Sequence, residues 1–96
     1  MVIGVLQIEL MIDGSTSLKD KRRVVKSLKD RLHREHMVSV AEVEAEDEMG
    51  RAVLGITMAS NSVPHCQRTL DKLVERITAG RGYHVSDHDV QILTGQ

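Results

Sequence analysis

The amino-acid sequence predicts an α+β fold in which two helices cover one face of a four-stranded antiparallel sheet. Three observations predict it. Alternating or β-branched apolar residues mark four strand segments, apolar residues recur at helical spacing in two others, and the order is β-α-β-β-α-β. When both β-α-β connections cross over in the usual right-handed sense, this order gives one antiparallel sheet with both helices on the same side. This arrangement is the ferredoxin-like plait, with the first and third strands at its centre.

The first strand is predicted over residues 2–12, where the even positions are apolar and should face the core. Turn residues follow, and Ser17 with Asp20 three positions later resembles a helix N-cap. The first helix is expected from Leu18 to about residue 35 or 36, with an apolar stripe along one side.

The other elements follow from the same patterns. Strands are predicted over residues 37–43 and 51–60, joined by an acidic hairpin connection, and a second helix after the Asn61-Ser62 cap runs up to Gly80. The last strand is expected over residues 84–93, with a bulge or an exposed edge at residues 87–89.

Length and composition exclude several classes of protein. The 96 residues predict a single domain over residues 1–96, and 41% hydrophobic with 28% charged residues is the usage of an ordinary soluble domain. Residues 1–12 resemble neither a signal peptide nor a membrane helix, so we expect a cytoplasmic protein and no membrane partner. The single cysteine, Cys66, fits the apolar stripe of the second helix and is interpreted as a buried, inert thiol.

Motifs that carry catalysis are absent from the sequence. It contains no glycine-rich phosphate loop, no spacing that specifies a catalytic triad and no cysteine pair for zinc. We therefore predict no catalytic residues, no metal site and no cofactor, and lean towards a protein that is not an enzyme. With Tyr83 as the only aromatic residue, the chain also lacks the platforms on which bases stack.

The net charge of −1 conceals an uneven distribution. Residues 18–36 carry eight Lys or Arg and three acidic residues, whereas residues 37–50 carry five acidic residues and no Lys or Arg. A helix face of one sign is typical of a surface that binds a polyanion or an acidic protein. The candidate binding residues on this face are Lys19, Arg22, Arg23, Lys26, Lys29, His33 and Arg34.

Two other interpretations of these charges remain open. The basic face is either an ordinary solvated surface or is matched by the chain's own acidic hairpin. The acidic hairpin is also a candidate partner for the basic helix of a second copy, because opposite charges attract across an interface. Its spacing does not match the ligand pattern of a calcium loop.

The sheet face opposite the helices is expected to expose apolar side chains without cover. Residues expected on it are Ile3, Val5, Met11, Val53 and Ala59. Self-association would cover them, so we predict a homodimer or larger homo-oligomer built on that face or on a sheet edge.

Several motifs are spread over nearly the whole chain: VIGVL at residues 2–6, SLKDKRRVVKSL at 17–28, DRL at 30–32, VSVAEV at 38–43, RAVLG at 51–55 and VQIL at 90–93. Together they resemble the YlxP-like family of small bacterial proteins. The resemblance implies a ferredoxin-like plait, an uncharacterised function and no established catalytic residues. The genes of this family often lie among those for translation initiation and ribosome maturation, which implies a role near the ribosome.

The resemblance also bears on single residues. It carries over Lys19, Lys21, Arg22, Arg23 and Lys26 as the family's basic helix, and Ser39 and Glu42 as part of the second-strand motif. Lys21 lies within the apolar stripe of the first helix, so either its stem passes the core edge or its ammonium meets a carboxylate. The shared motifs favour a structural ion pair between Lys21 and Glu42. Met37 and the Glu48-Met49 pair replace aromatic residues that are common in the family.

Two functional hypotheses follow. The first is a non-catalytic protein whose basic first helix contacts structured, ribosomal RNA through phosphates and helix shape. The alternative is a homo-oligomeric interaction module of the translation or ribosome-maturation machinery, with a ribosome-associated protein as its partner.

Overall fold

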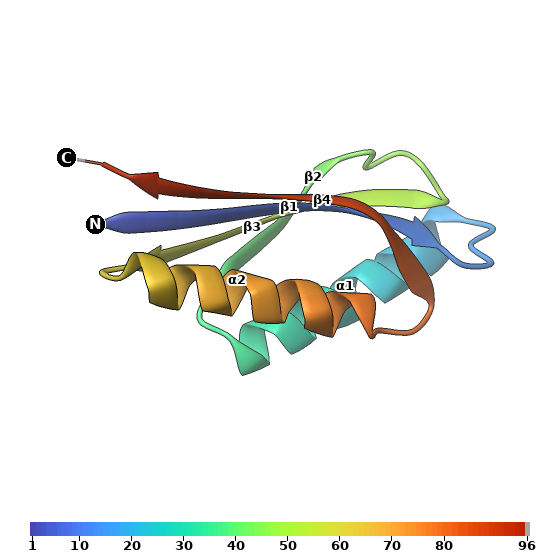
Figure 1. The fold of residues 1–96 in the computed structure, drawn as a ribbon. Helices are drawn as coiled ribbons and strands as arrows, with labels where there is room; N and C mark the ends of the chain where they lie inside the picture. The colour runs from blue at the N-terminus through green and yellow to red at the C-terminus, as the bar shows by residue number, and fades with distance from the viewer. Residues whose placement is uncertain (96) are drawn as a thin grey trace.

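The computed structural model describes residues 1–95, and its elements follow the predicted order. Their bounds are β1 Val2–Ile12, α1 Leu18–Glu35, β2 Ser39–Glu44, β3 Arg51–Ser60, α2 Val63–Thr78 and β4 Tyr83–Thr94. The strands form one antiparallel sheet in the order β2-β3-β1-β4, which confirms β1 and β3 as its central strands. Figure 1 shows both helices on one face of the sheet, as a ferredoxin-like plait requires.

The core lies between the sheet and the helices. Even-numbered residues of β1 are buried against the apolar stripes of α1 and α2, as the period-two pattern predicts. Burying each large aliphatic side chain in this layer contributes roughly 1.5–3 kcal/mol to folding. Cys66 belongs to this layer and is completely buried, which agrees with its interpretation as a core thiol.

Gly4 lets α2 approach the central strand closely. A Cβ atom built at Gly4 would lie 2.5 Å from the Cys66 sulfur and 3.0 Å from a methyl group of Leu70. Any side chain at this position would therefore push α2 away from β1. The glycine fixes the distance between the helix layer and the sheet.

The structure corrects the start of β2 and the place of the bulge. The prediction began β2 at Met37, but pairing with β3 starts at Ser39, because His36 still donates its backbone N–H to Leu32 and closes the helix. The bulge in β4 falls at Ser86, which is skipped between the pairs of Glu9 and Leu10, and not at residues 87–89. Residues 87–89 do lie on an edge strand.

The sheet face opposite the helices is less uniformly apolar than predicted. Ile3, Val5 and Met11 are half-buried and Ala59 is exposed. Val53 is only 2% exposed, because polar side chains of the neighbouring strands surround it. Apolar residues on this face are therefore separated by polar ones, with Ile3 and Val5 near the start of β1 and Met11 near its end.

Candidate functional site

The outer face of α1 carries the predicted basic residues in one continuous surface. The helix buries Lys21, Val25, Leu28 and Leu32 on its inner side, so residues on the opposite side face solvent. Eighteen residues give the helix a length of about 27 Å. We call this surface the basic face: Lys19, Arg22, Arg23, Lys26, Lys29, His33 and Arg34, all exposed except the half-buried Lys29.

Lys26 is the one residue of the basic face that forms an ion pair among residues 1–95. Lys26 bonds to Asp30 at 2.8 Å one turn later, and the positive side chains around Asp30 hold its pKa below the ordinary value. The other six residues of the basic face have no carboxylate oxygen within 4.0 Å among residues 1–95. Exposed cationic side chains that gather on one side of a helix without ion-pair partners create a positive potential, which attracts anions.

The chain's own acidic hairpin, residues 44–50, does not neutralise the basic face. Its carboxylates at Glu44 and Glu48 face Arg51, at 3.9 Å and 3.0 Å. Glu46 and Asp47 are exposed, and their carboxylates form no ion pair within residues 1–95. The positive and negative regions of the molecule therefore remain separate surfaces.

Lys21 joins α1 to this hairpin from the buried side of the helix. Its ammonium donates to the backbone carbonyls of Ala45, Glu46 and Arg51, at 2.6, 3.2 and 3.1 Å. These three acceptors use its three N–H donors. Ala45, whose carbonyl accepts one of these bonds, has a φ of 65°, a backbone conformation that is uncommon for a residue with a side chain.

Glu42 supplies the charge that balances this buried ammonium. Its Oε2 lies 2.9 Å from the Lys21 nitrogen. The oxygen is buried and its geometry does not meet that of a hydrogen bond, so the contact is an ion pair. Lys21 and Glu42 thus form the buried pair that the shared motifs favoured, and neither belongs to the exposed basic face.

A shallow groove separates α1 from the edge strand β2. It has a volume of about 500 Å³, with Val25 in its wall and cations along its rim. Lining residues from the basic face are Arg22, Lys26, Lys29 and His33, and Glu42 lines the β2 side. Asp30 also lines the groove, so its four cationic or basic side chains stand beside two carboxylates as the surface extends towards the sheet edge.

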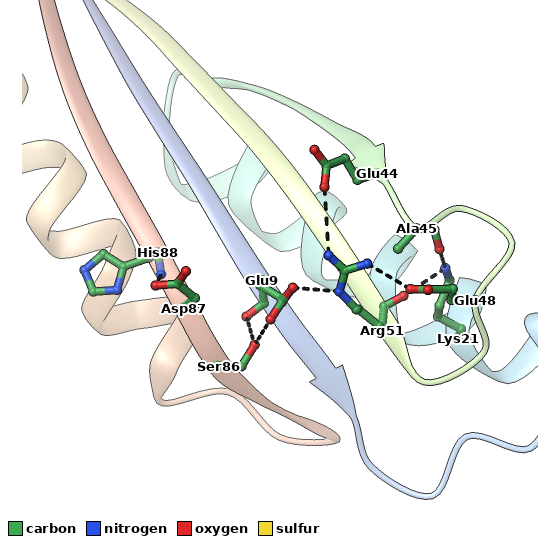
Figure 2. Close-up of polar contacts among 9 residues, drawn as sticks. All are labelled: Glu9, Lys21, Glu44, Ala45, Glu48, Arg51, Ser86, Asp87 and His88. Carbon is green, nitrogen blue, oxygen red and sulfur yellow. Dashed lines mark hydrogen bonds and ion pairs between the residues drawn. The ribbon is translucent and has the colours of Figure 1, made fainter.

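The opposite face of the sheet holds a second polar cluster, which sequence patterns did not indicate. Figure 2 shows Glu9 of β1 between Ser86 of β4 and Arg51 of β3. Glu9 accepts from Ser86 Oγ and from Arg51 Nε, each at 2.6 Å. The Ser86 hydrogen bond, followed by that of Arg51, lowers the pKa of Glu9, and the carboxylates of Glu9 and Glu48 raise the pKa of Arg51.

The charged groups of this cluster pair with one another. The Arg51 guanidinium already faces three carboxylates and donates hydrogen bonds to two of them, so its charge is compensated within the cluster. Across residues 1–95, no three His, Cys, Asp or Glu side chains are grouped to hold a metal ion. The cluster fastens β1, β3 and β4 together at one end of the sheet.

Two arginines outside the predicted set share a hollow with the basic face. Arg31 of α1 and Arg81, which precedes β4, line it together with Arg23. Periodicity could not have found Arg81, because it lies between two glycines in a connection, and only the fold brings it beside α1. Over residues 1–95, no helix is long and apolar enough to cross a membrane.

Comparison with known proteins gives a family and no activity. A family model described as "Protein of unknown function (DUF503)" matches residues 3–90. The "Uncharacterized protein YlxP" of Bacillus subtilis (strain 168) is 30% identical over 73 residues, which cover 76% of this chain and 79% of that protein. Since the family model spans most of the chain and the relative agrees with it, this protein belongs to the DUF503, or YlxP-like, family of proteins of unknown function.

Proposed function

We propose that this protein is a non-catalytic RNA-binding protein that holds structured RNA against the basic face of α1. The observation that carries the proposal is the uncompensated charge: six of the seven basic-face residues have no carboxylate partner among residues 1–95. Solvated helices usually mix charges at i and i+4, whereas Asp30, between Lys26 and Arg34, is the one acidic residue at this spacing on the face, and only Lys26 forms an ion pair with it. A polyanion would supply the missing negative charge.

The chemistry of the basic face favours a particular mode of RNA recognition. Lys and Arg contact phosphates, and a straight helix presents them along a line about 27 Å long. The only aromatic side chain, Tyr83, is buried, so stacking on unpaired bases has no support. Double-stranded, structured RNA read by shape and phosphates is therefore the class that fits, and ribosomal RNA is the first example to test.

The test is fluorescence-anisotropy binding to a structured ribosomal RNA fragment over a series of salt concentrations. We expect affinity to fall with salt, with a log–log slope of about −0.7 to −0.9 for each phosphate contact. Lys19→Glu/Lys26→Glu should abolish most binding. The matched control is Arg68→Glu/Lys72→Glu, which makes the same charge change on the exposed side of α2. Equal loss in both variants, or no binding at low salt, contradicts the proposal.

A second candidate function, self-association through β2, is favoured by a separate observation. The outer edge strand β4 carries a bulge and the charged residues 87–89, which discourage pairing. The other edge strand, β2, has its own register shift between Glu42 and Glu44, but the residues before it, 39–41, are regular, uncharged and free of proline. We propose that two copies pair their β2 strands antiparallel about a two-fold axis.

Charge complementarity supports this pairing. β1 and β2 are parallel and α1 runs back between them, so His33 and Arg34 lie beside the start of β2 and the acidic hairpin lies at its end. An antiparallel β2 pair would bring Glu46 and Asp47 of one copy towards His33 and Arg34 of the other. Both basic faces would then remain on the same side of the joined sheet.

Light scattering at micromolar concentration tests the pairing. We expect a dimer, which Glu46→Lys/Asp47→Lys weakens through repulsion with the helix of the second copy. Adding His33→Glu/Arg34→Glu to that variant should restore the dimer, because the charges become complementary again. A monomeric wild-type protein would contradict this second candidate and leave the RNA proposal intact.

A further inference from the structure

The hollow beside α1 that contains Arg81 lies at the junction of three segments. It has a volume of about 230 Å³ and a floor formed by Val24 and Leu28. Its polar lining comes from α1, from the connection between α2 and β4, and from the start of β4: Arg23, Ser27, Arg31, Arg81 and Tyr83.

Three guanidinium groups surround this hollow, and no carboxylate among residues 1–95 lines it. None of Arg23, Arg31 and Arg81 has a carboxylate oxygen within 4.0 Å in the range 1–95. Three positive charges around one small concavity repel one another. An anion bound among them would be attracted to all three and would offset this repulsion. Arginine is also the side chain best suited to bidentate contacts with phosphate oxygens.

Tyr83 fixes the inner wall of the hollow. Its hydroxyl donates to the carbonyl of Ile77 at 2.6 Å, and Arg31 Nη2 donates to the Tyr83 hydroxyl oxygen at 3.5 Å. Burial raises the pKa of Tyr83, so the phenol stays neutral and does not cancel the charge of Arg31. The half-buried Arg31 is thus held beside the hollow with most of its donors unused.

Two glycines place Arg81 at the rim. A Cβ atom at Gly80 would lie 2.0 Å from the Tyr83 hydroxyl, so only glycine fits there. Gly82 has a φ of 89°, a conformation that residues with side chains rarely adopt. The connection is therefore folded tightly over Tyr83, and Arg81 between the two glycines is carried towards α1.

We propose that this hollow binds a terminal phosphate group, a phosphate monoester, through Arg23, Arg31 and Arg81. A monoester carries about two negative charges at neutral pH, whereas a backbone diester carries one, so three guanidiniums favour the terminal group. The volume is below the range of about 300–1,000 Å³ of drug-sized pockets, which suits one phosphate with the first atoms of its carrier. The Ser27 hydroxyl offers a further donor.

Titration with inorganic phosphate, followed by amide chemical shifts at constant ionic strength, tests the site. We expect saturable shifts confined to the residues that line the hollow. Arg81→Gln should weaken binding about tenfold or more, since a charge-assisted hydrogen bond contributes about 1.5–3 kcal/mol. Arg81→Lys keeps the charge, and its affinity for phosphate should lie between those of the wild-type protein and Arg81→Gln. Arg68→Gln, an exposed arginine of α2, is the matched control and should change nothing.

Two further titrations identify the source of the phosphate. One compares a 5′-phosphorylated oligoribonucleotide with its 5′-hydroxyl form, and the other compares adenosine 5′-monophosphate with adenosine. Preference for the phosphorylated form in either arm supports the site. Equal binding of both forms, or shifts spread evenly over all cationic side chains, overturns it. Arg23 belongs to both surfaces, but Arg81 lies outside the basic face, so Arg81→Gln tests phosphate binding in the hollow and Lys19→Glu/Lys26→Glu tests binding of structured RNA.

Discussion

Lys21 is the residue whose loss should cost this fold most. Its ammonium is fully buried, satisfies three backbone carbonyls of the hairpin and β3, and faces Glu42 at 2.9 Å. Lys21→Met keeps the apolar stem but leaves the carboxylate and the carbonyls without a partner. We expect the free energy of unfolding, measured by urea denaturation, to fall by about 3–5 kcal/mol.

Two variants separate the charge of Lys21 from its packing. Lys26→Met removes a lysine of the same helix whose ammonium is exposed, and its effect should be a small fraction of that for Lys21. Lys21→Met/Glu42→Leu removes both charges and should recover part of the lost stability. If Lys21→Met unfolds no more easily than Lys26→Met, the ammonium is not the link between α1 and the hairpin.

Glu9 should make the stability of the fold depend on pH on the acid side. Hydrogen bonds from Ser86 and Arg51 lower its pKa below the ordinary 4.5. Its stabilising contribution is therefore full above about pH 4.5 and is lost as pH falls through the lowered pKa of the folded state. Urea denaturation between pH 3 and 7 should show Glu9→Gln less stable at neutral pH but with a shallower acid decline. Glu75→Gln, which changes an exposed carboxylate of α2, should keep the wild-type profile.

At the scale of elements, α1 depends on its N-cap, which the sequence predicted correctly. Ser17 Oγ accepts from the backbone N–H of Asp20 at 3.1 Å, and the Asp20 carboxylate accepts from Thr16. Ser17→Ala should lower the free energy of unfolding by about 1 kcal/mol. Ser27→Ala, on the exposed side of the same helix, is the matched control and should be close to neutral or slightly stabilising. Equal effects of the two changes would contradict a capping role.

The elements that the sequence predicted well have strong periodic patterns. β3 begins and ends at the predicted residues, and β1 and α1 agree as well, because each has an amphipathic pattern and clear turn or cap residues at its ends. The start of β2 and the position of the bulge in β4 were predicted less well. Pairing with β3, which no local pattern reports, decides that Met37 lies outside the sheet and that Ser86 is skipped.

The candidate site was predictable only where one helix carries it. Residues such as Arg23 and Lys26 share a helix face, so their spacing alone brings them together. Arg81 reaches α1 only through the path of the chain after α2, and Glu9 meets Arg51 only through the strand register. Sites built from several elements depend on tertiary structure, and a single sequence does not contain that information in a readable pattern.

At the scale of the whole molecule, the two layers differ in charge. The helix layer carries the basic face and the three arginines around the hollow, whereas the open sheet face and the hairpin carry Glu9, Glu44 and Glu48 around a single arginine. Such a molecule orients itself in the field of a polyanion before contact. The net charge of −1 is therefore compatible with the proposed RNA binding, in which phosphates would approach the helix layer.

Alkylation of the Cys66 thiol measures whether the whole fold opens cooperatively. This thiol is fully buried between α2 and β1, so an alkylating agent reaches it only when the core opens. Native protein should resist a mild alkylating agent, and protein in denaturing urea should react at once. When opening and closing are fast, the reaction rate follows the population of the open form. Lys21→Met, with its expected loss of about 3–5 kcal/mol, should then react at least about a hundredfold faster, although Lys21 lies on the other helix. If that variant reacts at the wild-type rate while its urea midpoint falls, Cys66 is exposed by local movement of α2 and the two helices do not unfold as one unit.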